Sequence, residues 1–266
     1  MTTKINLSDY LFLAPTPPQD LIRVGGPNDG GYVTSKSIVL DSSCLLSFGI
    51  SYDISFEYDF VKLSSVTKQV YMYDKTTLPY SSKYIISRIL HSIKFISPKP
   101  MLSYIRFLFK LKYLLNSRSF LFKTNVANTN GPDEITISKI LTKIPFKKGI
   151  FLKIDIEGNE YELLPDIVKH ITSFSSVIIE FHEVTVYFEL ITNFVKDLSF
   201  SGLSLDHLHV NNYGGISENG IPNVLELSFS RSMNRESQIM NLPYPNLDSP
   251  NSPLRPDYEI TFEKTN

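Results

Sequence analysis

Continuous apolar runs alternate with amphipathic stretches over most of the chain. A strand buried in a parallel sheet is apolar along its whole length, whereas a covering helix is apolar every three or four positions. The apolar runs predict strands at 44–50, 69–74, 120–128, 149–156, 175–183, 203–210 and 221–231. The stretches between them predict helices at 55–65, 133–144 (opened by Asp133), 157–171 and 185–202, with a further helical stretch after the second strand.

This alternation of strands and helices predicts an α/β fold with a mostly parallel, doubly wound sheet. Right-handed crossovers would place the carboxyl ends of the parallel strands at one edge, where ligands bind in such folds. We expect a single domain over residues 1–266 with three additions: an N-terminal segment at 1–40 that contains RVGGPNDGGYV, a basic helical insertion at 80–118 and a proline-rich C-terminal extension at 241–266.

The composition excludes several classes of protein. With 266 residues, 42% hydrophobic and 20% charged, the chain can bury the core of one large domain and is not a disordered tail. A single cysteine, Cys44, excludes an internal disulfide framework and a cysteine-based zinc site. The N-terminus MTTKINLSDY lacks a basic region followed by an apolar one, so we expect no cleaved secretory signal and a cytoplasmic location.

The net charge of −1 conceals a segregation of charge. Between Asp74 and Asp133 there are ten basic residues and no acidic one, so the rest of the chain has a net charge of −11. The segment 80–118 is also rich in Ile, Leu, Phe and Tyr, which is typical of a surface for an anionic partner such as a membrane face, a charged glycan or a nucleotide-linked donor. The alternative is two amphipathic helices with lysines at the rim of an apolar face. A chain pI of about 6.5 argues against a nucleic-acid partner.

Two residues at the ends of the first predicted strands favour a nucleotide-like ligand. The strand 44–50 runs into Gly49, and the small residue Ser51 follows it, so backbone N–H groups can approach a ligand closely here. Asp74 ends the next strand, 25 residues after Gly49, at the position that holds ribose hydroxyls in a Rossmann-like sheet. The chain has no GxGxxG motif here, and Asp74 could instead cap the following helix.

Carboxylates and imidazoles end the later strands. Asp155 and Glu157 follow the most apolar strand and would share a face if the strand continued. A charge at the end of a buried strand is costly, so these two carboxylates would hold a divalent cation, accept a hydroxyl proton or contact a cationic substrate. The alternative is that Glu157 and Glu160 cap the N-terminus of the next helix. Glu180 and His182 end the next strand. His207 and His209 alternate on the strand after it and are followed by Asn211 and Asn212. These residues could form a metal site or a proton-transfer site, or the histidines could be structural.

The order of these motifs resembles a known family. SFGISYDISFE, VYMYDKT, LKIDIEGNEYELL and IIEFHE are similar to segments of the FkbM-type S-adenosylmethionine-dependent methyltransferases. RVGGPNDGGYV, HLHVNNYGG and PNSPLRPDYEITF resemble a subgroup found among glycan- and capsule-modifying proteins. The resemblance implies the class I methyltransferase fold, a seven-stranded Rossmann-like sheet, and methylation of an oxygen on a small molecule or sugar.

The resemblance also implies roles for particular residues. Gly49, Ser51 and Asp53 would lie beside the methionine part of S-adenosylmethionine, Asp74 would bind its ribose, and Asn125 would lie near the adenine. Asp155 and Glu157 would face the sulfonium and the acceptor, and a manganese or magnesium ion would be held by Asp155 and Glu180 with His182 or His209. The base would be Glu157 or His209, since a sugar hydroxyl needs a metal or a positioned base to react at neutral pH.

The sequence therefore predicts an S-adenosylmethionine-dependent O-methyltransferase that acts on a sugar or glycan hydroxyl. A nucleotide-sugar glycosyltransferase is the alternative enzyme, because Asp155-x-Glu157 faintly resembles the acidic metal motifs of that class. A non-catalytic module that docks on a membrane or partner through 80–118 is the alternative outside enzymes. A homodimer is left open as the assembly.

Overall fold

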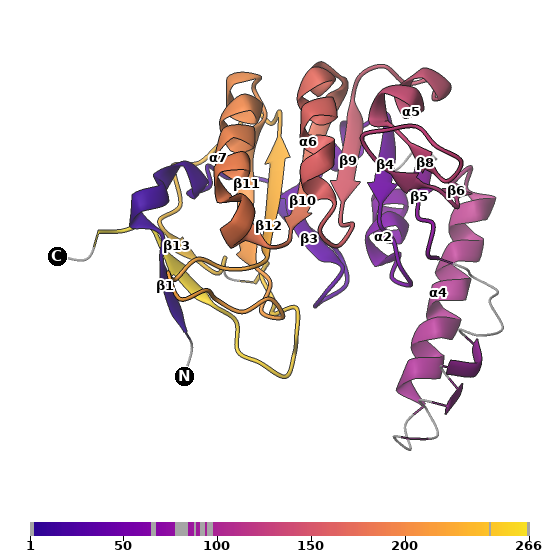
Figure 1. Ribbon diagram of the computed structural model, residues 1–266, viewed down its shortest axis with the longest axis horizontal. Helices are drawn as coiled ribbons and strands as arrows, with labels where there is room; N and C mark the ends of the chain where they lie inside the picture. The colour runs from indigo at the N-terminus through magenta and orange to yellow at the C-terminus, as the bar shows by residue number, and fades with distance from the viewer. Residues whose placement is uncertain are drawn as a thin grey trace.

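The centre of the molecule is a seven-stranded sheet (Figure 1). The computed structural model describes residues 3–64, 68–77, 85–87, 89–90, 94, 98–244 and 246–264. In spatial order the strands are β11 (Ser204–Val210), β12 (Leu225–Ser230), β10 (Phe174–Phe181), β9 (Ile150–Ile154), β4 (Cys44–Phe48), β5 (Gln69–Tyr73) and β6 (Phe120–Phe122). Neighbouring strands are parallel except at β12, which is antiparallel to both of its neighbours.

The strand order identifies the fold. The chain enters the sheet at its centre with β4, adds β5 and β6 on one side, and returns to add β9 and β10 on the other. It then places β11 at the far edge and inserts β12 between β10 and β11. This is the class I methyltransferase arrangement, so the prediction of a seven-stranded, mostly parallel, doubly wound sheet is confirmed. All residues of β4 and β9 are buried, as expected for central parallel strands that are covered on both faces.

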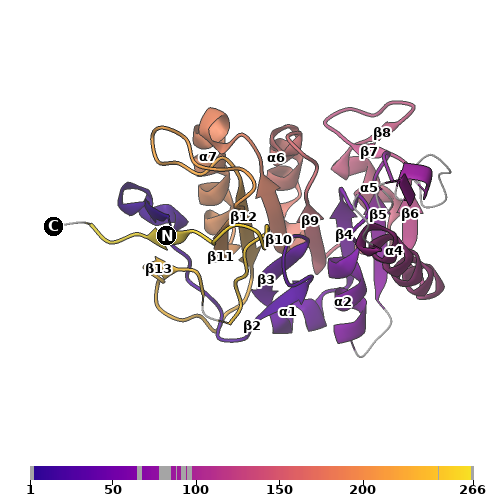
Figure 2. The ribbon, with the colours of Figure 1, turned by 90° about the horizontal axis from the view of Figure 1, so that it is seen from below.

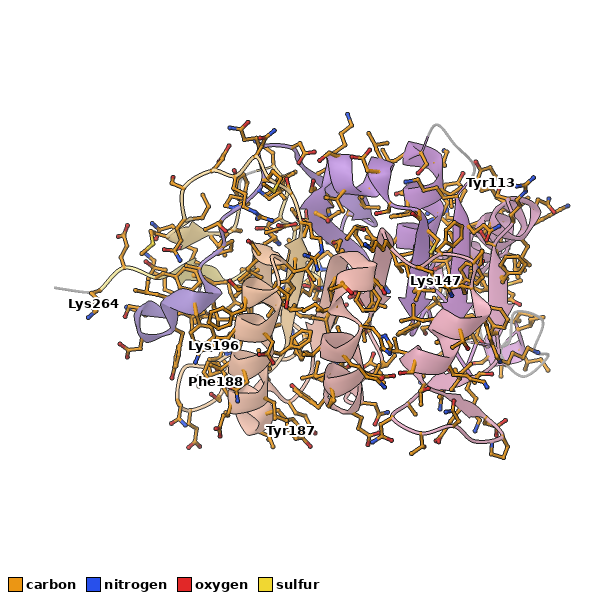
Figure 3. All side chains as sticks on the ribbon, turned by 90° about the horizontal axis from the view of Figure 1, so that it is seen from above. Tyr113, Lys147, Tyr187, Phe188, Lys196 and Lys264 are labelled. Atoms are coloured by element: carbon orange, nitrogen blue, oxygen red, sulfur yellow. The ribbon has the colours of Figure 1, made fainter. Side chains whose placement is uncertain are left out.

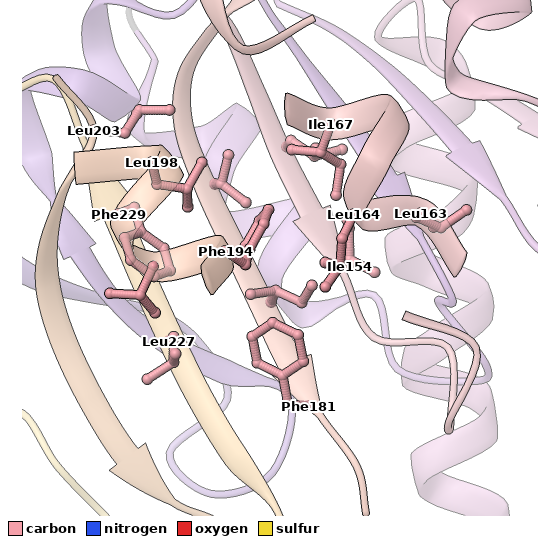
Figure 4. Packing of buried hydrophobic residues seen from close by; sticks show 14 of the residues in the cluster. Ile154, Leu163, Leu164, Ile167, Phe181, Phe194, Leu198, Leu203, Leu227 and Phe229 are labelled. Carbon is pink, nitrogen blue, oxygen red and sulfur yellow. The ribbon is translucent and has the colours of Figure 1, made fainter. Parts of the chain in front are cut away.

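Helices cover both faces of the sheet (Figures 1 and 2). One face carries α5 (Ile137–Lys143), α6 (Glu160–Lys169) and α7 (Val184–Phe200). The other carries α1 (Lys36–Asp41), α2 (Ser55–Leu63), α4 (Lys99–Asn116) and the hairpin of β2 (Leu21–Gly25) and β3 (Gly31–Ser35). On the first face, apolar side chains three or four positions apart on α6 and α7 meet those of the sheet, including Leu164, Ile167, Phe194, Leu198 and Phe229 (Figure 4).

The two ends of the chain pair with each other. Strand β1 (Lys4–Asn6) is parallel to β14 (Glu259–Thr261), which is antiparallel to β13 (Asn241–Leu242). The structure also contains two short 3-10 helices, η1 (Ser8–Leu13) and η2 (Ile171–Ser173). Both termini therefore lie at the end of the molecule away from α4 (Figure 1).

Two predicted elements differ from the structure. The strand expected over 120–128 is two strands: β6 ends at Phe122, and β7 (Asn125–Val126) pairs outside the central sheet with β8 (Glu134–Ile135). The helix expected from Asp133 begins only at Ile137, because the Oγ1 of Thr136 accepts a hydrogen bond from the backbone N–H of Lys139 at 3.1 Å and caps α5.

The basic insertion at 80–118 contains one long helix in its described part, α4. Part of the remaining stretch, including 80–84, 91–93 and 95–97, lies outside the described residues, so the second predicted helix is not assessed there. A stripe of Tyr104, Phe107, Leu111 and Leu114 buries one face of α4 against the domain. Nowhere in the described chain is a helix both long enough and apolar enough to span a bilayer.

Candidate functional site

A cavity of about 1090 Å³ lies at the carboxyl edge of the sheet, next to the ends of β4, β5 and β9 and beside α4. Its lining contains every residue that the sequence assigned to the cofactor: Gly49, Ser51, Asp53, Asp74, Asn125 and Asp155. Glu157 also lines it, whereas Glu180, His182 and His209 lie outside the described lining. The structure thus gathers the cofactor set around one space.

Gly49 holds the carboxyl ends of two strands together. Its φ of +73° is in the left-handed region, and a Cβ added there would lie 1.6 Å from the backbone oxygen of Asp155. The N–H of Asp155 donates to the carbonyl of Phe48 at 3.0 Å, which extends the pairing of β4 and β9 to the cavity edge. Only glycine allows this close approach, and it sets the place of Asp155 in the cavity wall.

Asp74 binds the backbone of the two loops at the cavity rim. Its Oδ2 accepts from the N–H of Ser51 at 2.7 Å and of Ile50 at 3.1 Å, and its Oδ1 accepts from the N–H of Thr76 at 2.7 Å and of Thr77 at 2.9 Å. Burial raises the pKa of Asp74, but these hydrogen bonds outweigh it and leave the pKa below its ordinary value. The arrangement resembles the capping alternative, because both oxygens already accept bonds and a ribose would have to replace one of them.

Asp53 orients the helix that follows it. Its Oδ1 accepts a hydrogen bond from the backbone N–H of Ser55 at 2.8 Å, at the start of α2. Its carboxylate also lies against Gly30, where an added Cβ would be 2.9 Å from Oδ2. Asp53 therefore fixes α2 relative to the β2–β3 turn at the mouth of the cavity.

Lys153 is a buried cation in the cavity wall that our sequence analysis missed. Side chains alternate along β9, so Lys153 points, like Phe151, toward the face covered by α2 and the β2–β3 hairpin. Its Nζ lies 3.8 Å from Oε1 of Glu57 and 5.3 Å from the ring centre of Tyr32. Burial lowers the pKa of Lys153, but Glu57 and Asp155 more than compensate and raise it. The sequence signal that could have found it is a lysine within an apolar strand, because burying a charged side chain is costly unless charged or hydrogen-bonding partners surround it.

Tyr32 connects two carboxyl groups from neighbouring strands. Its hydroxyl lies 3.1 Å from Oδ2 of Asp155 and 3.2 Å from Oε2 of Glu180, and Asn211 donates to the other oxygen of Glu180 at 2.9 Å. Burial raises the pKa of both carboxyls, and the charge of Asp155 and of Glu226 adds to the rise for Glu180. A phenol has one proton, so the Tyr32 hydroxyl can donate to only one of these two carboxyl groups at a time.

Glu157 and His182 meet beside Asp155. Strand β9 ends at Ile154 and Glu157 has a φ of +57°, so the expectation that Asp155 and Glu157 share a strand face is wrong. The Glu157 carboxylate lies 3.3 Å from Nε2 of His182, whose Nδ1 is 3.0 Å from Oε1 of Glu160. Burial lowers the pKa of His182, but the hydrogen bond and charge of Glu160, with the charge of Glu157, raise it overall. His182 is more readily a cation than a base.

His209 occupies a buried position between two carboxylates. Its Nδ1 lies 3.2 Å from Oε2 of Glu226, and its Nε2 lies 3.1 Å from Oδ2 of Asp257. Burial lowers the pKa of His209, but these partners reverse the effect and raise it to about 10. Both nitrogens are engaged and the ring stays protonated at neutral pH, so His209 is not placed to act as the base or as a metal ligand. Its partner on the same strand, His207, pairs with Asp248 at 2.9 Å.

The C-terminal extension completes this region. Nδ2 of Asn251 donates to Glu226 at 2.6 Å and to Asp29 at 3.3 Å. Oδ1 of Asn212 accepts from the backbone N–H of Ser252 at 2.7 Å and so holds the extension in place. The sequence analysis did not connect the extension to the site, although HLHVNNYGG carried unexplained polar residues that bind it.

A family comparison fits this geometry. Residues 106–206 match the model of the "Methyltransferase FkbM domain", a range that contains Asp155, Glu157, Glu180 and His182. The match covers 101 of the 266 residues. Together with the strand order, it shows that the chain is an S-adenosylmethionine-dependent methyltransferase. The comparison with curated proteins gives no match.

Solved methyltransferases resemble the chain only distantly. A precorrin-6y C5,15-methyltransferase from Geobacter metallireducens is 12% identical, with 73% of this chain and 87% of that chain covered and a TM-score of 0.37. A putative rRNA-methylase from Clostridium thermocellum is 11% identical, with 73% and 91% covered and a TM-score of 0.40. The class I assignment of this chain rests on its strand order, not on these similarities.

The cavity of this methyltransferase fits the cofactor that its activity requires. Ligand sites commonly measure about 300–1,000 Å³, so a cavity of about 1090 Å³ has room for a cofactor and an acceptor together. Gly49 and the backbone next to it line the cavity, and an added Cβ at Gly49 would collide with the backbone oxygen of Asp155. These residues therefore suit S-adenosylmethionine.

The metal set that the sequence suggested, Asp155 and Glu180 with His182 or His209, is brought together only in its version with His182, whose Nε2 lies 3.6 Å from Oε1 of Glu180. Asp155 and Glu180 do end neighbouring strands, but His209 is held behind them by Glu226 and Asp257. In the described part of the chain, two other groups place one potential ligand atom from each residue within 4.8 Å of one another. They are Asp155 with Glu157 and His182, and Asp29 with Glu180 and Glu226.

Proposed function

We propose that this methyltransferase methylates a hydroxyl group of a sugar or glycan. The observation that carries the proposal is Asp155, an acidic side chain in the wall of the cavity, held by Tyr32 and flanked by the Gly49 turn. Burial raises the pKa of Asp155 above its ordinary value, which makes its carboxylate a better proton acceptor than an exposed aspartate.

The proposed reaction is a direct substitution. S-adenosylmethionine supplies a methyl group on a positively charged sulfur. As the acceptor oxygen bonds to the methyl carbon, the carbon–sulfur bond breaks with its electrons on sulfur, and Asp155 takes the hydroxyl proton. The positive charge of Lys153 opposes the effect of burial on the pKa of Asp155 and so favours its ionised form.

The polar character of the cavity supports a hydroxyl-rich acceptor. Asp29, Asp155 and Glu157 line it with carboxylate oxygens that accept hydrogen bonds from hydroxyls, and Lys153 can donate to an acceptor oxygen. In the same cavity, the proposed cofactor positions are the Gly49 turn for the methionine part and Asn125 for the adenine.

A metal-assisted route is the second candidate. Asp155, Glu157 and His182 could hold a divalent ion that lowers the pKa of the acceptor hydroxyl. The observation in its favour is that Nδ1 of His182 is bonded to Glu160, which is how histidine ligands are commonly oriented with their other nitrogen free for a metal. This set shares Asp155 and His182 with the predicted one and has Glu157 in the place of Glu180.

The test is transfer of labelled methyl to a panel of saccharides and amines. We expect methylated saccharide, a loss of kcat of about 100-fold or more in Asp155→Asn, and cofactor affinity within a few-fold of wild type. Glu189→Gln, at an exposed position on α7, is the matched control and should keep full activity. Methylation of amines alone would refute the hydroxyl acceptor, and glycosyl transfer from a nucleotide sugar would favour the rival enzyme.

A further inference from the structure

Helix α4 has a second apolar face that no described residue covers. Opposite its buried stripe, Leu102, Ile105, Phe109 and Tyr113 follow each other at spacings of three and four residues. They are 46%, 37%, 71% and 43% exposed. More than half of the large apolar side chains exposed in the described chain lie between Ile86 and Phe122, so the exposure is concentrated here. Apolar surface gathered in this way marks an interaction site.

The same segment carries the positive charge of the molecule. No acidic residue occurs between Asp74 and Asp133, and Arg106 and Lys112 are exposed on α4. Lys110 instead folds back, with its Nζ 3.1 Å from Oγ of Ser55. Since the rest of the chain has a net charge of −11, an anionic surface is attracted to this segment and repelled elsewhere.

We propose that the apolar face formed by Leu102, Ile105, Phe109 and Tyr113 docks on an anionic lipid surface. A helix with aliphatic and aromatic side chains on one face and lysine or arginine beside them lies in the plane of a membrane interface. With 18 residues, α4 offers a contact about 27 Å long. It stands at the end of the molecule away from both termini, and Tyr113 lies at that end (Figures 1 and 3).

Two other occupants fit less well. A nucleic acid would use the basic groups but would leave the aliphatic side chains Leu102 and Ile105 without a function. A second copy of the chain would bring two segments of the same positive charge together, which opposes association. An anionic lipid surface satisfies both the apolar and the charged side chains.

Docking has a consequence for the cavity. Arg106, Phe107 and Lys110 line the cavity from the neighbouring side of α4, so a docked helix brings the cavity rim close to the lipid surface. If the proposed function holds, an acceptor attached to a lipid would then be within reach. This consequence rests on the proposed function, whereas docking itself does not.

The test is co-sedimentation of the full chain with vesicles. We expect binding to vesicles of phosphatidylcholine with phosphatidylglycerol, little binding to phosphatidylcholine alone, and weaker binding as salt increases. Phe109→Ser and Lys112→Glu should each weaken binding by about tenfold. The matched controls Phe200→Ser, which is 90% exposed on α7, and Lys196→Glu, which lies away from α4 (Figure 3), should bind as wild type does.

Three results would overturn the proposal. These are no binding to either kind of vesicle, equal losses in Phe109→Ser and Phe200→Ser, or binding only to an oligonucleotide or to a second copy of the chain. Unchanged thermal unfolding and binding of S-adenosylhomocysteine would show that the variants are folded. Vesicle binding needs neither cofactor nor acceptor, so its failure is distinct from a failure of methyl transfer.

Discussion

Replacing Gly49 by alanine tests the close approach that forms the cavity wall. The matched control is Gly220→Ala, because Gly220 has a φ of +74° against +73° for Gly49 but has no atom within 4 Å of an added Cβ. Both variants force alanine into the left-handed region, at a cost of roughly 1–2 kcal/mol. The difference between them isolates the contact with the backbone oxygen of Asp155.

The size of that difference follows from the geometry. A Cβ at Gly49 would lie 1.6 Å from the oxygen, so the ends of β4 and β9 must separate until the distance exceeds 3.0 Å. The separation weakens the hydrogen bonds from Asp155 to Phe48 and from Gly49 to Tyr73, each worth about 1 kcal/mol. Strain in the packed surroundings adds roughly 1–3 kcal/mol. We therefore expect Gly49→Ala to lose about 3–5 kcal/mol more than Gly220→Ala.

Thermal unfolding followed by circular dichroism measures this difference. In a chain of this size, 1 kcal/mol corresponds to about 2 °C, so Gly220→Ala should lower the Tm by about 2–4 °C and Gly49→Ala by about 6–10 °C more. S-adenosylhomocysteine should raise the Tm of Gly220→Ala as it does for wild type and should have little effect on Gly49→Ala. Equal Tm values for the two variants would refute the close approach of β4 and β9.

Two further predictions concern charge. The pKa of His209, raised from 6.5 to about 10, means that its stabilising contribution is fully present below about pH 6.5 and is lost as the pH rises through 10. The free energy of unfolding of the wild type should therefore fall between pH 7 and 10 with a slope that His209→Gln lacks, and identical slopes would contradict the assignment. Activity should survive treatment with EDTA, because Lys153 already supplies a positive charge beside Asp155. Loss of activity on chelation that manganese or magnesium restores would instead assign Asp155, Glu157 and His182 as ligands.

The sheet could be predicted from the sequence because its strands are apolar without interruption. The runs around β4, β5, β9 and β10 differ clearly from the helical stretches between them, and their order requires crossovers in one direction. The failures lie where the signal is local and short. At 120–128 the apolar pattern continues across a break in pairing, and at 133–144 the capping residue is Thr136 and not Asp133.

The cavity residues at strand ends were also predictable, because parallel strands bring their carboxyl ends to one edge. Gly49, Asp74 and Asp155 needed only correct strands to be placed together. Tyr32 could not be found in this way, since it comes from a hairpin 123 residues before Asp155 and has no periodic signal. Asp257, which contacts His209 from the C-terminal extension, could not be found for the same reason.

The buried charges at the strand ends divide into two layers with different tasks. Behind the cavity, protonated His209 offsets the charge of Glu226 and Asp257, and the C-terminal extension closes this layer. In the cavity wall, the charge of Lys153 and the hydrogen bond of Tyr32 both lower the pKa of Asp155, against the effect of burial. Because an unpaired buried charge is far more costly than a paired one, each layer needs its own cation. Asp155 is one of several carboxyl groups in the cavity lining, and we propose it as the proton acceptor because it lies next to the Gly49 turn.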